Sequence, residues 1–473
     1  MDTQRQTGNL QSPSKRAAGP TTETLDESQR AERTLERRAV EAAVWGMPIV
    51  SVDAMRQGFF GVGAKYGDIV YFSRPADWKF QLTTPNSSSL YAYFNFNLKD
   101  GPVVIDFPAA VGAGLFGSIM DAWQEPIADV GPEGEDQGKG GKYLMLTPGF
   151  KGNTPAGYIP LTFKTNNGYA AFRAIPKTRS EEDTAKALAL VKQLRLYPLA
   201  QAANPPPTRH IDAAGKNFEG IASFDDAFYD SLARMVNEEP VLERDTIAIS
   251  QMRSLGIEKG KEFKPHESTR TILKKAIGEA HINFMEAASL MVPYWPNAHW
   301  GAPAYLATGA GTAFTFQTDS GIDLDGRAAM FFFACAAPRK LGAATLYQLA
   351  ARDAADAPFD GAKTYHLHVP PNVPARQFWA VTVYDLETAA FIRESPKTEI
   401  NSYQELRKNA DGSVDVFFGP KAPENVESNW IFTAPGKRWV AAFRFYGPEP
   451  AIHDKSWQLP DIEPAGEGRG TAH

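Results

Sequence analysis

Residues 85–91 gather hydrogen-bonding side chains just before a segment of alternating hydrophobicity. They read Pro-Asn-Ser-Ser-Ser-Leu-Tyr, which supplies an amide, three hydroxyls and a phenol. Such a run can be a plain turn, or it can form the rim of a small-molecule pocket. A serine hydroxyl becomes a nucleophile only beside a base, which the sequence does not show. We take Ser88 and Tyr91 as catalytic candidates and Asn86 as a substrate-binding candidate.

Aromatic residues stand beside carboxylates and amides in two further segments. On a strand, Asp121 and Trp123 would share one face and Gln124 would lie on the other. A small-molecule pocket needs an apolar wall with a few fixed polar groups, which Trp123, Gln124, Trp379 and Tyr384 would supply. Asp121 is the candidate acid or base. For any single residue the plainer interpretation, an aromatic core residue or a turn-capping carboxylate, is favoured, but not for the set.

A substrate anion would be held by Lys142 or Arg444. Lys142 ends a glycine-rich segment, but Glu133 stands where a P-loop needs its first glycine, five positions before Gly138. The sequence also lacks the Gly-x-Ser-x-Gly elbow of α/β-hydrolases and the glycine fingerprint of dinucleotide-binding folds. We therefore assign no cofactor.

His366 and His368 lie two residues apart on an expected strand, so their side chains share a face. Two such histidines are half of a metal site. No second half is evident, because the His-Glu-x-x-His pattern is missing and the other histidines are scattered. Cross-strand hydrogen bonding is the favoured interpretation, and a metal site is kept as an alternative.

The composition is that of a soluble globular protein of two or three domains, with 473 residues, 43% hydrophobic residues and a net charge of −6. This small charge gives no reason to expect nucleic acid or a membrane surface as a partner. Cys335 is the only cysteine, which rules out an intrachain disulfide, and its apolar neighbours favour a buried, inert thiol. The apolar run 328–337 is too short to span a bilayer.

The first 28 residues are polar, and an apolar signal region is missing from them. We expect a disordered leader there and, for the chain as written, a cytoplasmic location. A helix should follow and end at Gly46 and Pro48.

Period-two segments between residues 65 and 178 predict strands, amphipathic segments predict helices between 180 and 292, and aromatic, β-branched strands return from about residue 364. The expected fold class is therefore α+β and β-rich, with two antiparallel β-sandwich-like domains joined by a helical middle segment. We place the boundaries at 1–28 for the leader, 29–179 for the first domain, 180–310 for the helical segment, 311–460 for the second domain and 461–473 for a disordered tail.

Long motifs make the chain resemble a bacterial pair of modules, domain of unknown function family 1254 followed by family 1214. The first resemblance rests on "VEAAVWGMPIV", "TTPNSSSLYAYFNFNLKDGPVVIDFPA" and "LFGSIMDAWQEPIADVGPEGEDQGKGGKYLMLTPGFKG". The second rests on "TYHLHVPPNVPARQFWAVTVYD" and "DGSVDVFFGPKAPENVESNWIFTAPGKRWVAAFRFYGPEP". The resemblance implies two β-rich domains joined by helices, but no defined activity.

This chain departs from the resembled family at two points. Many members have Asp and Thr where this chain has Ser88 and Ser89, so the role of that acid does not transfer. Many also carry an export signal, so a periplasmic location applies if a signal was trimmed.

Our leading hypothesis is an enzyme that acts on a small organic molecule in a pocket between the two β domains. Hydrolysis or another proton transfer fits the candidate groups better than redox chemistry. The first alternative is a non-catalytic binding or assembly protein, and the second is a metal-dependent enzyme that uses His366 and His368. A homo-oligomer is left open.

Overall fold

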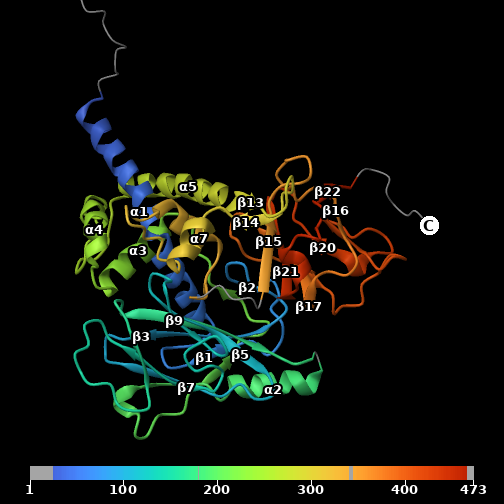
Figure 1. The fold of residues 1–473 in the computed structure, drawn as a ribbon. Helices are drawn as coiled ribbons and strands as arrows, with labels where there is room; N and C mark the ends of the chain where they lie inside the picture. The colour runs from blue at the N-terminus through green and yellow to red at the C-terminus, as the bar shows by residue number, and fades with distance from the viewer. Residues whose placement is uncertain (1–24, 179, 340–344, 466–473) are drawn as a thin grey trace, which may run out of the picture.

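The computed structural model describes residues 25–178, 180–339 and 345–465. It confirms an α+β protein built on mostly antiparallel sheets (Figure 1). The predicted leader, residues 1–28, lies mostly outside the described residues, and α1 begins at Glu27. Residues 466–473 also lie outside them, whereas β22 forms within the predicted tail and pairs with β16.

The N-terminal half contains a six-stranded sheet in the order β11-β1-β3-β9-β5-β6. Its strands are β1 (Ile69–Tyr71), β3 (Leu90–Asn97), β5 (Gly114–Asp121), β6 (Pro126–Val130), β9 (Asn167–Ile175) and β11 (His210–Asp212). A four-stranded sheet is made of β4 (Val103–Phe107), β7 (Gly141–Leu146), β8 (Ile159–Thr162) and β10 (Arg195–Pro198), while β2 (Phe80–Gln81) pairs with β12 (Phe218–Glu219). The consecutive strands β3 and β4 thus lie in different sheets.

The C-terminal half repeats this combination of a six-stranded and a four-stranded sheet. The larger sheet has the order β13-β14-β15-β21-β17-β18, with β13 (Met291–Pro293), β14 (Gly301–Pro303), β15 (Thr345–Ala350), β17 (Ala375–Asp385), β18 (Glu399–Asn401) and β21 (Trp439–Pro448). The smaller sheet is made of β16 (Tyr365–Val369), β19 (Val414–Gly419), β20 (Trp430–Phe432) and β22 (Glu463–Pro464). Buried residues of both sheets share one core, as Leu367 and Val416 do with Val381 and Phe443. The finer prediction of sandwich-like domains stays a prediction.

The helices gather beside the sheets in Figure 1. They are α1 (Glu27–Gly61), α2 (Glu181–Val191), α3 (Ala227–Glu238), α4 (Thr246–Met252), α5 (Glu267–Ser289), α6 (Leu306–Gly309), α7 (Leu324–Phe333) and α8 (Pro450–His453). None of the helices in the described ranges is both long and apolar enough to cross a membrane.

The prediction that the first helix ends at Gly46 and Pro48 is wrong, because α1 continues through both residues to Gly61. Pro48 removes one backbone hydrogen bond, but contacts with α3, α5 and α7 hold the helix on both sides of it. Gly46 serves packing instead of termination, since a Cβ there would lie 2.7 Å from Leu232 Cδ1. Tertiary packing overrides the local stop signal.

The apolar run 328–337 falls largely on α7, which packs against α1 and α5. This part of the predicted second β domain therefore belongs to the helical layer. Conversely, β10 to β14 lie within the segment 180–310 that we expected to be helical.

Candidate functional site

The two six-stranded sheets each present an arginine beside a tyrosine where they approach one another. Strand pairing puts Arg173 of β9 directly opposite Tyr91 of β3, and Arg444 of β21 directly opposite Tyr347 of β15. Arg173 Nη1 donates a hydrogen bond of 3.3 Å to Tyr347 Oη, which joins the two sheets. We call the set Tyr91, Arg173, Tyr347, Tyr384, Arg444 and Tyr446 the arginine–tyrosine cluster.

Arg444 is the buried centre of this cluster, with 4% of its surface exposed. Its Nη1 donates to Thr382 Oγ1 at 2.5 Å and its Nη2 donates to Tyr384 Oη. Its guanidinium carbon lies 5.2 Å from the ring centre of Tyr347 and 5.5 Å from that of Tyr384, so the cation is held between two aromatic rings. The Nε atom is buried without a hydrogen-bond partner.

Tyr347 combines access to solvent with a strongly positive surrounding. It is 37% exposed, although Tyr384 and Tyr446 beside it are buried. Desolvation alone would raise the pKa of Tyr347, but Arg173 and Arg444 outweigh it and lower that pKa to about 8. A fraction of the phenol is therefore ionised near neutral pH, so Tyr347 can accept a proton as well as donate one.

The serine-rich segment is both a turn and a contact between the two halves of the chain. Asn86 Oδ1 accepts hydrogen bonds from the backbone N–H groups of Ser88 and Ser89, which shapes the turn. Ser88 Oγ then donates to Glu399 Oε1 at 2.5 Å, and Tyr384 Oη donates to the carbonyl oxygen of Pro85. The segment thus lies against β17 and β18 of the C-terminal sheet.

Thr84, immediately before this segment, has a φ of +40°. A β-branched residue rarely adopts this backbone conformation, which is held here because the Thr84 N–H donates to the carbonyl oxygen of Ala389 at 2.7 Å. Strain of this kind clusters at functional sites.

Glu399 is a buried carboxylate of this contact that the sequence did not reveal. It is 5% exposed, and besides Ser88 its carboxylate accepts hydrogen bonds from the Ser87 N–H, Thr382 Oγ1 and Asn401 Nδ2. Both oxygens are therefore occupied. The prediction from sequence also missed Arg173 and Tyr347. Alternating hydrophobicity places both residues on strands, but it does not indicate which face of each strand meets the other domain.

An aromatic wall borders the cluster. Tyr446 stacks on Phe378 with ring centres 4.0 Å apart, and Phe378 contacts Tyr403 at 4.8 Å. Tyr446 lies two residues after Arg444 on β21, so both side chains share a face. The Tyr446 Oη is buried without a partner.

Asp121, Trp123 and Gln124 lie apart from the cluster, at the tight turn between β5 and β6. Asp121 Oδ1 accepts hydrogen bonds from the backbone N–H groups of Trp123 at 2.8 Å and Glu125 at 2.9 Å. Burial, with the Glu125 carboxylate, raises the pKa of Asp121 to about 8. Gln124, with φ +62°, donates to the carbonyl oxygen of Pro48 and accepts from Tyr169 Oη. These contacts fix the turn against α1.

Trp123 packs against cations and another indole. The guanidinium carbons of Arg244 and Arg327 each lie 5.2 Å from its ring centre, and Trp45 contacts it edge-on at 4.8 Å. Burial, followed by repulsion from Arg244, lowers the pKa of Arg327 to about 10.

Lys142 and Trp379 also lie outside the cluster. Lys142 is exposed on β7 of the four-stranded sheet, near the ring of Tyr158. Trp379 is buried on the opposite face of β17 from Ala380 and stacks on Phe443 at 5.4 Å. It lines a small surface pocket together with Ser402.

His366 and His368 both contact one carboxylate. His366 Nε2 and His368 Nδ1 each lie 2.9 Å from Asp415 Oδ1, on the neighbouring strand β19. Within residues 25–178, 180–339 and 345–465, no group of three or more His, Cys, Asp or Glu is placed to hold a metal ion. The favoured interpretation, cross-strand hydrogen bonding, describes these contacts.

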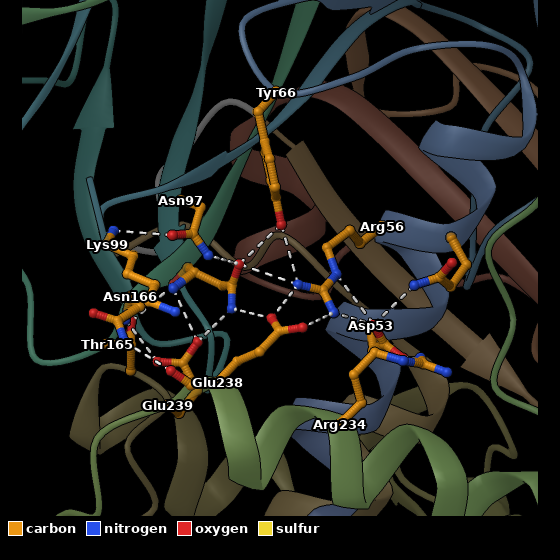
Figure 2. A network of polar contacts seen from close by, with 12 residues as sticks. Asp53, Arg56, Tyr66, Asn97, Lys99, Thr165, Asn166, Arg234, Glu238 and Glu239 are labelled. Atoms are coloured by element: carbon orange, nitrogen blue, oxygen red, sulfur yellow. Dashed lines mark hydrogen bonds and ion pairs between the residues drawn. The ribbon is translucent and has the colours of Figure 1, made fainter. Parts of the chain in front are cut away.

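A second buried arginine centre lies between α1, α3 and β9, and Figure 2 shows its dense polar contacts. Arg56 contacts Asp53 at 2.6 Å and Glu238 at 2.5 Å, and also donates to Asn167 Oδ1 at 3.1 Å. Arg234 of α3 pairs with the other oxygen of Asp53. We call this set the Arg56 network.

In comparisons with known proteins, one family model matches a segment of the N-terminal half of the chain and another matches a segment of the C-terminal half. Residues 67–198 match the family described as protein of unknown function DUF1254, and residues 344–450 match protein of unknown function DUF1214. The chain combines these two modules. Arg173 and Tyr91 belong to the first and Tyr347 and Arg444 to the second, so the cluster draws on both.

Two solved bacterial structures align with most of the chain. The VPA0106 protein from Vibrio parahaemolyticus is 16% identical, with a TM-score of 0.52, 91% of this chain covered and 100% of that chain. A putative uncharacterized protein from Burkholderia cenocepacia is 13% identical, with a TM-score of 0.40, 93% of this chain covered and 96% of that one. Among curated proteins, none matches. The first likeness shows the fold alone.

Proposed function

We propose that the protein is an enzyme that acts on a small organic molecule by proton transfer at the arginine–tyrosine cluster, between the two six-stranded sheets. The observation that carries this proposal is the hydrogen bond from Arg173 of one module to Tyr347 of the other, a residue that is 37% exposed. Reactive groups contributed by two domains are common at ligand sites.

Tyr347 takes the role of acid and base in this proposal. Its phenolate form is stabilised by Arg173 and Arg444. This phenolate accepts a proton either from the substrate itself or from a water molecule that attacks the substrate. The two guanidinium groups remain protonated throughout, and they stabilise negative charge that develops on the substrate. Hydrolysis and proton abstraction next to a carbonyl both fit this arrangement.

Ser88 and Tyr91 remain candidate residues of the proposed site. Ser88 Oγ already donates to Glu399, a carboxylate that accepts three other hydrogen bonds. This argues for Ser88 and Glu399 as positioning residues that hold the turn against the C-terminal sheet. Tyr91 is half-buried, and its Oη accepts a hydrogen bond from the Asn86 N–H at 3.3 Å.

The test incubates the purified protein with a bacterial small-molecule extract in deuterated water and follows products and deuterium uptake by mass spectrometry. We expect turnover of at least one compound, and a loss of about 100-fold or more in Tyr347→Phe, the lower end of the range for an acid–base group. Tyr294→Phe is the matched control, because Tyr294 donates to the carbonyl oxygen of Ile452 elsewhere in the C-terminal half.

Two outcomes would overturn the proposal. Turnover that Tyr347→Phe retains would remove Tyr347 from the mechanism. A compound that binds and is recovered unchanged would instead support the alternative of a non-catalytic binding protein.

A further inference from the structure

We propose that a cavity on the opposite face of β17 from the arginine–tyrosine cluster binds a small carboxylic acid with a compact apolar body. The cavity has a volume of about 140 Å³ and is lined by Trp379, by residues 369–373 between β16 and β17, by residues of the segment 402–408 after β18, and by Gly412 and Val414 at the start of β19. We call it the Trp379 cavity. It adds a second binding site to the site of the proposed function and does not depend on that function.

Strand pairing separates the Trp379 cavity from the arginine–tyrosine cluster. On β21, Phe445 lies opposite Trp379 and Arg444 lies opposite Ala380. Because successive side chains of a strand point to opposite faces of the sheet, Trp379 and Arg444 lie on different faces. Trp379 belongs to the core that the two C-terminal sheets share, together with Val414. A ligand in the cavity would therefore bind apart from the Arg444 guanidinium.

Hydrogen bonds within the protein hold the walls of the cavity. The Trp379 N–H donates to Ser402 Oγ at 3.2 Å, and the Ser402 N–H donates to the Trp379 carbonyl oxygen at 3.0 Å. Trp457 Nε1 donates to the carbonyl oxygen of Pro371 at 3.2 Å, which fixes the turn before β17. Walls that are already ordered reduce the entropic cost of binding a ligand.

The size and the lining of the cavity suit a compact apolar group. Pro370, Pro371, Leu406 and Val414 line it beside Trp379. An apolar cavity of about 150 Å³ in another protein holds a molecule of benzene, so a ring or branched chain of about six carbon atoms fits a volume of this size. The removal of such a group from water supplies favourable free energy of binding.

Lys408 sets the charge of the cavity. It is the only ionisable residue among the described residues that line the cavity. Within residues 25–178, 180–339 and 345–465, Lys408 has no ion-pair partner within 4 Å. Asp411, in the same loop, accepts hydrogen bonds from the Ser413 N–H and the Ser413 hydroxyl. A carboxylate on the ligand would therefore meet a positive charge and no lining carboxylate.

Unused hydrogen-bond donors favour an acid over an amine as the ligand. In the described part of the chain, neither Trp379 Nε1 nor Gln404 Nε2 donates a hydrogen bond, although Gln404 Oε1 accepts one from the Asn401 N–H at 3.4 Å. The two oxygens of a carboxylate can accept hydrogen bonds from such donors and from Lys408 Nζ. An amine would add further donors, and Lys408 would repel its charge.

The experiment titrates the full chain, prepared with isotopically labelled tryptophan, with cyclohexanecarboxylate, cyclohexanecarboxamide and acetate, and follows the indole N–H signals by NMR. The amide keeps the ring without the charge, and acetate keeps the charge without the ring. We expect cyclohexanecarboxylate to shift the Trp379 signal, which Trp379→Phe identifies. Its affinity should exceed that of the amide about fivefold, as for an exposed ion pair, and that of acetate about tenfold or more.

Substitutions of Lys408 test the charge. Lys408→Gln should lower the affinity for cyclohexanecarboxylate about fivefold and leave the affinity for the amide unchanged, whereas Lys408→Arg should retain most of the affinity for the acid. The matched control is Lys421→Gln, because Lys421 is also exposed but does not line the cavity.

Equal affinity for the acid and the amide, or equal losses in Lys408→Gln and Lys421→Gln, would overturn the inference. A Trp379 signal that the acid leaves unmoved would overturn it as well. Loss of the binding in Arg173→Gln would place the ligand at the arginine–tyrosine cluster instead.

Discussion

The Arg56 network and the arginine–tyrosine cluster differ in the partners that they give to a buried guanidinium group. Arg56 donates to Asp53, Glu238 and neutral acceptors, so its charge is compensated inside the protein (Figure 2). Arg444, equally buried, donates to a hydroxyl and a phenol and keeps an unpaired Nε. Compensated charge fixes helices to a sheet, whereas the proposed function relies on the charge of Arg444 beside Tyr347.

The largest effect should come from removing the compensated arginine. Arg56→Gln leaves Asp53 and Glu238 without a partner, and breaking a buried ion pair in this way costs about 3–5 kcal/mol. Urea unfolding measures this loss. Arg173→Gln should cost about 1 kcal/mol or less, because it removes a 3.3 Å hydrogen bond to Tyr347 and leaves no buried carboxylate without its partner. Similar losses in both variants would erase the distinction between the two regions.

Asp121 extends the comparison to a buried carboxyl group that accepts hydrogen bonds from backbone N–H groups. Because its pKa is raised to about 8 in the folded state, the folded protein binds a proton that the unfolded chain releases. Its contribution to stability is therefore full below pH 4 and decreases as the pH rises from 4 to 8. In Asp121→Asn, the loss of unfolding free energy between pH 4 and pH 8 should be smaller by at least about 1 kcal/mol.

The measurement is the free energy of unfolding of wild type and Asp121→Asn at several pH values between 4 and 8. Asp411→Asn serves as control, because Asp411 is exposed and its pKa is lowered, chiefly by a hydrogen bond from Ser413. A parallel pH dependence in wild type and Asp121→Asn would show that Asp121 ionises normally.

A further effect should follow from adding a carboxylate beside Glu399, next to the arginine–tyrosine cluster. Ser88→Asp, the residue type that the family resemblance places here, would face Glu399, whose oxygens already accept four hydrogen bonds. Like charges at this distance disfavour ionisation of one carboxyl group, so we expect a loss of about 1–3 kcal/mol at pH 7 that diminishes toward pH 4. Thermal unfolding at the two pH values checks this. Ser88→Asn, similar in size but neutral, should show no such pH dependence.

The strands could be predicted from the sequence because alternation is a local signal. Segments such as residues 90–97 and 439–448 are strands in the structure as in the prediction. The long helix α1 was cut short in the prediction because Pro48 is a local stop signal, whereas the contacts that preserve the helix come from residues far along the chain. Neither the division of β3 and β4 between two sheets nor the place of α7 is encoded in local periodicity.

The candidate site was predicted in part for the same reason. Ser88, Tyr91, Tyr384 and Arg444 were selected by residue type, and the structure brings them together. Asp121 was selected by the same criterion and lies elsewhere. Arg173 and Tyr347 are separated by 174 positions, so only the approach of the two sheets makes them a pair.

The division of the cluster between two modules also bears on how such genes can evolve. Each module supplies one arginine and at least one tyrosine, so recombination that exchanged either half would replace part of the chemistry as well as a block of fold. Under the proposed function, a change at Arg173 would therefore alter the effect of changes at Tyr347, in a distant stretch of the reading frame. The two modules would then be retained together.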